Sequence, residues 1–171
     1  MTAHSDNIEL ARQVIEACRA RDIMIATAES CTGGLIATTL TEIPGSSAVF
    51  DRGFVTYSNG AKIEMLGLFP ITLKQYGAVS KETAMEMAHG ALARSEAGLS
   101  VACTGIAGPD GGTPEKPVGL VHIAAKHYNG TMLHRDMQYG DIGRAAVRFA
   151  TVHTALEMML KLAVIDPNYK G

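Results

Sequence analysis

A hydroxyl-rich and glycine-rich segment follows the first buried apolar run of the sequence. The run from Ile23 to Ala26 leads into Thr27-Ala28-Glu29-Ser30-Cys31-Thr32-Gly33-Gly34, and an apolar helical pattern comes next. The first N–H groups of a helix have no partners inside the helix, so a turn before a helix can bind an anion or stabilise an oxyanion. The segment therefore predicts either acyl transfer with Ser30 as the nucleophile, or anion binding.

Two other roles are open for this segment. A hydroxyl at the start of a helix is a common cap, so Ser30 or Thr32 can be purely structural. Cys31 is a second candidate nucleophile, because a helix N-terminus lowers the pKa of a neighbouring thiol. A catalytic thiol usually has a histidine partner, however, and the sequence indicates none nearby.

Lys62 and Tyr57 are the candidates for moving a proton. Lys62 falls in the first turn of a predicted helix opened by Ser58 or Asn59, where the helix dipole disfavours a cation. Positive potential and partial burial lower the pKa of a lysine, and a neutral amine can accept the proton of a serine hydroxyl. Tyr57 precedes this helix and could pass or orient the proton. The structural alternatives are a solvated lysine and a core tyrosine.

A second glycine-rich turn follows a predicted strand over residues 99–103. It reads Thr104-Gly105-Ile106-Ala107-Gly108-Pro109-Asp110-Gly111-Gly112 and lacks the patterns of a P-loop or a dinucleotide fingerprint. Its glycines allow a ligand to approach backbone N–H groups, so it is either a pocket wall for a phosphate or carboxamide, or a surface turn. Arg144 and Arg148 could clamp a phosphate, unless both are solvated helix residues.

The elements that position these residues alternate between helix and strand. Apolar periodicity predicts helices over 7–21, from 35 to before Pro44, and over 61–66, 80–92 and 142–162. Strands are predicted over 23–27, 49–57, 99–103, 118–125 and 131–139, the last two joined as a hairpin at Asn129-Gly130. We expect Ser5 or Asp6 to cap the first helix, and Gly53 to form a bulge. The inner face of the last helix is predicted to carry Ala146, Phe149, Val152, His153, Leu156, Met159 and Leu160. This alternation predicts an α/β layered domain with a mixed sheet.

Composition narrows the class of protein. With 171 residues, 47% of them apolar, the chain is long enough for one core, and we predict a single domain over 1–171. The net charge of −2 and the 5% of aromatic residues argue against a nucleic-acid partner. The sequence has neither an apolar stretch of roughly 20 residues nor a signal pattern at its start, so we expect no membrane partner and a cytoplasmic location. The sequence does not decide whether the chain forms a homo-oligomer.

Cysteine and histidine usage indicates reduced thiols and no metal. The three cysteines are widely spaced, and Cys18 and Cys103 lie in apolar patterns typical of core residues. The six histidines show no ligand spacing with cysteine, aspartate or glutamate. We therefore predict no metal site and no cofactor.

Several segments together resemble one known family, the CinA carboxyl-terminal domain family, which includes the nicotinamide-nucleotide amidohydrolases. The resemblance runs in order from about residue 8 to residue 160. It is carried by Ala28 to Gly34, Gly45-Ser46-Ser47, Arg52-Gly53-Phe54-Val55-Thr56-Tyr57-Ser58-Asn59, Gly77-Ala78-Val79-Ser80, Thr104 to Gly112 and Lys116-Pro117-Val118-Gly119.

The resemblance implies a three-layer α/β/α domain that hydrolyses the carboxamide of nicotinamide mononucleotide (NMN), giving nicotinate mononucleotide and ammonia in pyridine-nucleotide salvage. It implies Ser30 as the nucleophile, Lys62 as the general base and Tyr57 as an assisting hydroxyl. Substrate-binding residues would be Thr32, Gly33, Thr104, Gly105, Ile106, Gly108 and Arg144. The resemblance also implies a stand-alone form of a domain that is often fused to a molybdopterin-binding-like domain.

One segment departs from the family pattern, which has Gly-Asp-Arg before the last helix. This sequence has Gly140-Asp141-Ile142-Gly143-Arg144 there, so a group other than Arg144 remains an alternative for binding the phosphate. Outside the resemblance, the two glycine-rich turns would equally suit a non-catalytic nucleotide-binding module.

Overall fold

The structure is a computed structural model that describes residues 3–165. The predicted domain over 1–171 thus includes two short ends, 1–2 and 166–171, that lie outside the described residues. The helices are α1 (Ala3–Arg19), α2 (Leu35–Thr41), α3 (Asn59–Leu66), α4 (Pro70–Tyr76), α5 (Lys81–Ala93) and α6 (Arg144–Ala163), with a short 3-10 helix η1 (Ser46–Ala48). The strands are β1 (Ile25–Glu29), β2 (Phe50–Val55), β3 (Leu99–Gly105), β4 (Leu120–His127) and β5 (Met132–Gln138).

The strands form one mixed sheet in the order β2-β1-β3-β4-β5. Strands β2, β1 and β3 are parallel, whereas β4 runs antiparallel to both β3 and β5. The parallel strands β1 and β3 are almost wholly buried, as expected for strands covered on both faces. Their carboxyl ends meet at one edge of the sheet, where open α/β sheets bind their ligands.

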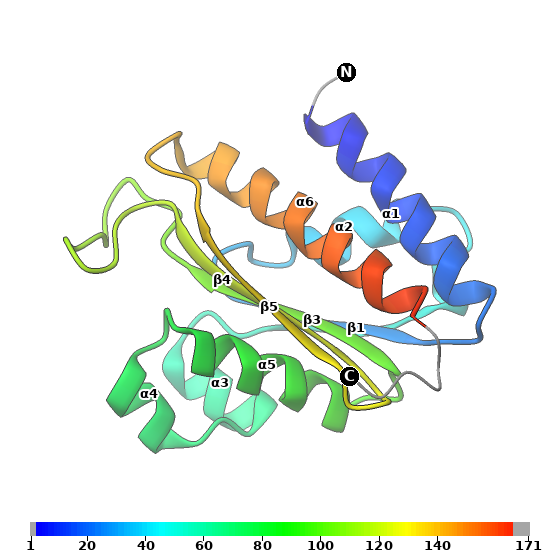
Figure 1. Cartoon of the computed structure of the whole chain (residues 1–171), viewed down its shortest axis with the longest axis horizontal. Coiled ribbons are helices and arrows are strands. Elements are labelled where there is room, and N and C mark those ends of the chain that lie inside the picture. The colour runs from blue at the N-terminus through cyan, green and yellow to red at the C-terminus, as the bar shows by residue number, and fades with distance from the viewer. Residues whose placement is uncertain (1–2, 166–171) are drawn as a thin grey trace.

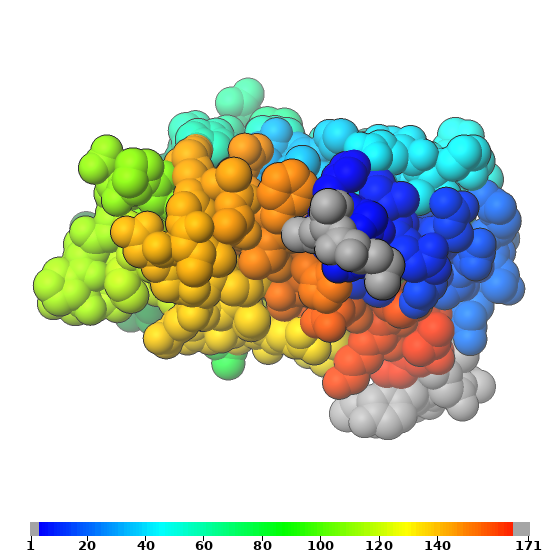
Figure 2. All heavy atoms as spheres, turned by 90° about the horizontal axis from the view of Figure 1, so that it is seen from above, coloured from blue at the N-terminus to red at the C-terminus, as the bar shows by residue number. Residues whose placement is uncertain are grey.

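Helices cover both faces of the sheet, which gives three layers (Figure 1). Helices α1, α2 and α6 lie over one face, and α3, α4 and α5 lie over the other (Figure 1). Each interface has its own apolar cluster, the larger one beneath α1 and α6 and the smaller one beneath α5. From above, α1 and α6 lie side by side, and the loop between β3 and β4 projects at one end (Figure 2). The predicted α/β class with a mixed sheet is confirmed.

Local signals placed several boundaries correctly. Ser58 caps α3 by accepting a hydrogen bond from the Ala61 N–H, and Ser80 caps α5 in the same way. Cys18 and Cys103 are fully buried core residues, as predicted.

Three local predictions are wrong. Ser5 and Asp6 lie inside α1, which begins at Ala3. The irregularity in β2 lies between Phe50 and Arg52, where the register with β1 shifts, and not at Gly53. Gly53 instead pairs regularly with Thr27, against whose hydroxyl a Cβ atom would lie at 2.9 Å. On α6, Ala146 and His153 are exposed, because the buried face is centred on Val147, Thr151, Ala155 and Met158. The sequence analysis also missed α4, which begins at Pro70.

Gly90 allows α5 to pack closely against the end of α3. A Cβ atom at this position would collide with the backbone carbonyl oxygen of Leu66. We therefore expect Gly90→Ala to lower the free energy of unfolding by about 1–3 kcal/mol, although alanine favours helices. Gly60→Ala in α3 is the matched control, because the nearest atom lies 3.9 Å from the added Cβ. Urea unfolding of both variants tests this, and an unchanged midpoint for Gly90→Ala would contradict it.

Candidate active site

A cavity of about 270 Å³ lies at the carboxyl ends of the three parallel strands. Four loops, together with the starts of α3 and α6, form its walls. The lining residues are Ser30, Cys31, Tyr57, Asn59, Lys62, Ala78, Val79, Thr104, Gly105, Ile106, Ala107, Gly108, Asp110, Gly111 and Arg144. Eight of the ten residues predicted for the site therefore surround one cavity, which brings together segments far apart in the sequence.

Ser30 and Lys62 are in direct contact inside this cavity. The Lys62 Nζ atom lies 3.1 Å from the Ser30 Oγ atom, although the residues are 32 positions apart. The Nζ atom also donates a hydrogen bond of 2.7 Å to the carbonyl oxygen of Thr56. The amine is thus fixed on one side by the backbone, with the serine hydroxyl on its other side.

Burial suits Lys62 to act as a base. Its side chain is only 1% exposed, and its recorded hydrogen-bond partners within residues 3–165 are uncharged oxygen atoms. Burial disfavours the ammonium form and lowers the pKa of Lys62, with a smaller opposing effect from the thiols of Cys103 and Cys31. Lys62 therefore loses its proton more readily than an ordinary lysine, and its neutral amine can accept a proton from Ser30.

Tyr57 and Arg144 meet on another wall of the cavity. The Arg144 guanidinium donates a hydrogen bond of 2.8 Å to the Tyr57 hydroxyl and one of 2.9 Å to the Gly108 carbonyl oxygen. Both acceptors are uncharged. The structure thus places Tyr57 in the cavity as predicted, but the recorded partner of its hydroxyl within the described chain is Arg144, not Ser30 or Lys62.

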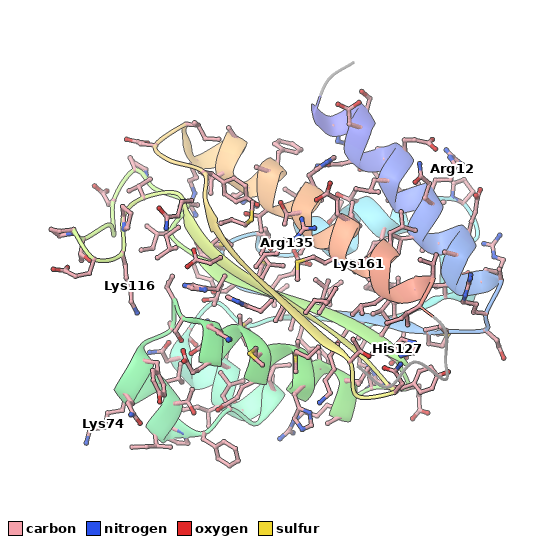
Figure 3. All side chains as sticks on the ribbon, in the orientation of Figure 1. Arg12, Lys74, Lys116, His127, Arg135 and Lys161 are labelled. Carbon is pink, nitrogen blue, oxygen red and sulfur yellow. The ribbon has the colours of Figure 1, made fainter. Side chains whose placement is uncertain are left out.

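The second glycine-rich turn lines the cavity beside the Ser30 turn, at the end of the neighbouring strand β3. The Thr104 hydroxyl donates a hydrogen bond of 2.7 Å to the Ala78 carbonyl oxygen, which joins this turn to the segment before α5. Further along the same loop, the Lys116 ammonium donates to the carbonyl oxygen of Tyr76, 2.7 Å away. Figure 3 shows the Lys116 side chain extending from the loop towards the end of α4. These two contacts fix the loop that carries Gly105, Ile106 and Gly108.

Thr32 and Gly33 are not among the residues that line the cavity. Thr32 is fully buried, and its carbonyl oxygen accepts a hydrogen bond of 2.8 Å from Arg148. Arg148 therefore supports the Ser30 turn, instead of joining Arg144 in a phosphate clamp. Gly33 and Gly34 both have positive φ angles, of 59° and 100°, which only glycine adopts readily.

Cys31 lines the cavity beside Ser30 but is 6% exposed. A hydrogen bond with the Cys103 thiol lowers the pKa of Cys31, while burial acts in the opposite direction. The contact of Lys62 is with the Ser30 hydroxyl. The geometry therefore favours Ser30 over Cys31 as the nucleophile.

The first backbone N–H groups of α2 already have hydrogen-bond partners. The helix after the turn begins only at Leu35, and its N–H groups at Ile36 and Ala37 donate to the Glu29 carboxylate at 2.8 and 3.0 Å. These donors are occupied. These N–H groups are therefore not free to bind an anion in the cavity, contrary to the expectation for the start of this helix.

The sequence analysis assigned no role to Glu29 or Thr56, which the structure places beside Ser30 and Lys62. For Glu29, a carboxylate at the end of a predicted buried strand must have polar partners nearby. That burial was the signal available in the sequence. The Thr56 carbonyl oxygen left no signal, because a backbone group has no residue type.

Within residues 3–165, no group of three or more histidine, cysteine, aspartate or glutamate side chains is placed to hold a metal ion. No helix in the same range is both long enough and apolar enough to cross a membrane.

The fold and the cavity together define an α/β/α domain with a serine–lysine pair at the carboxyl ends of its parallel strands. The chain belongs to the CinA C-terminal domain family, whose model matches residues 7–163. This confirms the resemblance inferred from the sequence.

Relatives and solved structures agree with this assignment. The chain is 49% identical over 154 residues to the nicotinamide-nucleotide amidohydrolase PncC of Enterobacter agglomerans, covering 90% of this chain and 93% of the relative. It is 47% identical over 151 residues to a CinA-like protein of Chlorobaculum tepidum, covering 85% of this chain. That match spans only 36% of the longer relative. The crystal structure of the competence/damage inducible protein CihA from Agrobacterium tumefaciens superposes with a TM-score of 0.91 at 62% identity, covering 92% of this chain and 95% of that one.

Proposed function

We propose that this chain is an amidase that hydrolyses the carboxamide of NMN, giving nicotinate mononucleotide and ammonia in pyridine-nucleotide salvage. The observation that carries the proposal is the 3.1 Å contact between Ser30 Oγ and the buried amine of Lys62. The name of the PncC relative, which covers nearly the whole chain, supports this substrate. The expected enzyme class, an amidohydrolase, agrees with that name.

The first half of the reaction forms an ester. The neutral Lys62 amine removes the proton of the Ser30 hydroxyl, and the Ser30 oxygen attacks the carboxamide carbon. When the C–N bond breaks, the Lys62 ammonium returns the proton to the leaving nitrogen, which departs as ammonia. The hydrogen bond from Lys62 to the Thr56 carbonyl oxygen holds the amine in place during both transfers.

The second half hydrolyses the ester with the same base. Lys62 removes a proton from a water molecule, and the resulting hydroxide attacks the acyl carbon. The C–O bond to Ser30 breaks, and Ser30 recovers its proton from Lys62. The products are nicotinate mononucleotide and free enzyme, so one water molecule is consumed for each ammonia released.

The substrate is best placed with its phosphate near Arg144. This guanidinium lines the cavity and bonds only to uncharged oxygens within the described residues, so its charge is available to an anion. In this arrangement Tyr57 orients Arg144, and Thr104, Gly105, Ile106 and Gly108 form the wall along the nucleotide. The direct contact between Ser30 and Lys62 needs no relay through Tyr57.

The test is ammonia release from NMN by the purified chain, coupled to glutamate dehydrogenase. Release that persists with a chelator present and is lost on Lys62→Ala supports the proposal. NMN binding without ammonia release would contradict it, and would favour a non-catalytic nucleotide-binding module. Rapid loss of activity with a thiol-alkylating reagent would instead favour catalysis by Cys31.

Replacing Arg144 should separate phosphate binding from catalysis. We expect Arg144→Gln to raise KM for NMN about tenfold or more, with kcat within threefold, because a charge-assisted hydrogen bond contributes about 1.5–3 kcal/mol. Nicotinamide riboside, which has no phosphate, is the control substrate. The variant should lose most of the preference for NMN over the riboside, measured as the ratio of kcat/KM values. An unchanged ratio would show that another group binds the phosphate.

A further inference from the structure

Glu29 is a buried carboxylate that directly precedes Ser30. Its side chain is 1% exposed, and both of its oxygen atoms accept hydrogen bonds. Oε1 accepts from the Thr32 hydroxyl at 2.7 Å and from the Ile36 N–H at 2.8 Å. Oε2 accepts from the Ala37 N–H at 3.0 Å. All three donors lie on the segment that follows Ser30, so the carboxylate joins the end of β1 to the start of α2.

These bonds hold the Ser30 turn from several directions. The Thr32 hydroxyl bonded to Glu29 also lies 3.1 Å from the Cys103 Sγ atom, and the Thr32 carbonyl oxygen is bonded by Arg148. On the backbone, the Ser30 N–H donates to the Cys103 carbonyl oxygen at 3.1 Å. The turn is therefore attached to β3 and α6 as well as to Glu29, and Glu29 supplies the contacts to both its centre and the following helix.

The mechanism above has no use for Glu29 as a proton carrier. Its described contacts are with Thr32, Ile36 and Ala37, and Glu29 is not among the residues that line the cavity. What its carboxylate does control is the path of the chain from Ser30 to α2. The carboxylate also occupies the first N–H groups of α2, so these groups cannot stabilise an oxyanion. The N–H groups of the turn are left for that role. Within residues 3–165, the N–H group of Cys31, which lines the cavity next to Ser30, donates to no backbone carbonyl oxygen.

We infer that Glu29 is a positioning residue of the active site: its carboxylate fixes the Ser30–Gly34 turn, and so holds the nucleophile on Lys62 and the turn N–H groups where the oxyanion forms. This inference rests on the proposed function. It assigns a role to a residue that touches neither the substrate nor the reacting atoms.

Glutamine is the sharpest replacement because it keeps the size of Glu29. One acceptor oxygen becomes an amide that donates, so at least one N–H of α2 then faces another donor. The turn has to shift to relieve this repulsion. A displacement of about 1 Å in a catalytic group costs about 100-fold in rate. The proposed substrate contacts of Arg144 and of the segment from Thr104 to Gly108 are untouched by this change. The loss should therefore fall on kcat.

The experiment compares kcat and KM for NMN in wild type, Glu29→Gln and two threonine variants. We expect Glu29→Gln to lower kcat about 30-fold to 100-fold with KM within threefold. Thr32→Val removes only the hydroxyl bonded to Glu29, and should lower kcat about tenfold. Thr39→Val is the matched control, because Thr39 is also buried and its hydroxyl bonds only within α2, to the Leu35 carbonyl oxygen. It should keep kcat within twofold.

The outcomes separate the two claims. If wild type releases no ammonia from NMN, the proposed function fails and this inference fails with it. If wild type is active and folded Glu29→Gln has an unchanged kcat, only the positioning role of Glu29 is overturned. If Glu29→Gln does not fold, Thr32→Val decides, and a kcat equal to that of Thr39→Val overturns the inference.

Discussion

Ser30→Ala is expected to lower kcat for NMN by about four orders of magnitude or more while leaving NMN binding within threefold of wild type. The substitution removes the oxygen that forms the acyl intermediate but leaves the walls of the cavity intact. Because Ser30 is 9% exposed and its side chain is small, its removal should barely affect folding. Ammonia release measures the loss of turnover, and isothermal titration calorimetry measures the retained binding.

The neighbouring thiol provides the matched control for this prediction. Cys31 lines the same cavity one position along the chain, and Cys31→Ala also removes a single heavy atom. We expect Cys31→Ala to keep kcat within about threefold. Substantial turnover by Ser30→Ala, together with loss of turnover by Cys31→Ala, would transfer the nucleophilic role to the thiol. Retained turnover in both variants would rule out either side chain as the nucleophile.

Most residues of the candidate site were predictable from their types and from their places at the ends of the predicted elements. A serine after a buried strand, a lysine in the first turn of a helix and a tyrosine before that helix each have a structural alternative. The structure joins all three to one cavity. The class of fold was predictable for a related reason, since helical and strand periodicities alternate along the whole chain. The distance between the Ser30 hydroxyl and the Lys62 amine could not be predicted from the sequence, because it depends on how the two loops pack.

Two of the wrong predictions depend on contacts between distant segments. The buried face of α6 is rotated from the predicted one, because it is decided by packing against β3, β4 and α1. At Gly53 a side chain would crowd the Thr27 hydroxyl on the neighbouring strand, so close packing and not a bulge accounts for the glycine. The role of Glu29 was hidden because its partners follow a turn whose shape depends on two glycines with positive φ angles. The failures on α6 and at Gly53 concern tertiary contact and not local preference.

Lys62→Met is expected to remove most activity and to leave a folded protein. Methionine has a similar length and no basic nitrogen, so Ser30 loses the group that accepts its proton. General-base catalysis contributes about 10²-fold to 10⁴-fold, and we expect kcat to fall by at least that range. In wild type, log(kcat/KM) should rise with pH and level off below pH 10.5, the ordinary pKa of lysine, because burial lowers the pKa of Lys62. The variant should lack this rise, whereas a variant that kept it would show that another group is the base.

Stability should change in the opposite direction from activity. A lysine whose pKa is lower in the folded state binds fewer protons there than in the unfolded chain, so it makes the fold more stable as pH rises. Below the lowered pKa, wild type bears the full cost of the buried ammonium group, and above the unfolded pKa it bears none. Lys62→Met removes this cost at every pH. We therefore expect its free energy of unfolding to exceed that of wild type most at low pH, and the excess to shrink as the pH rises towards 10.5. Urea unfolding of both proteins across this range tests the expectation, and an excess that is constant or grows with pH would contradict a lowered pKa for Lys62.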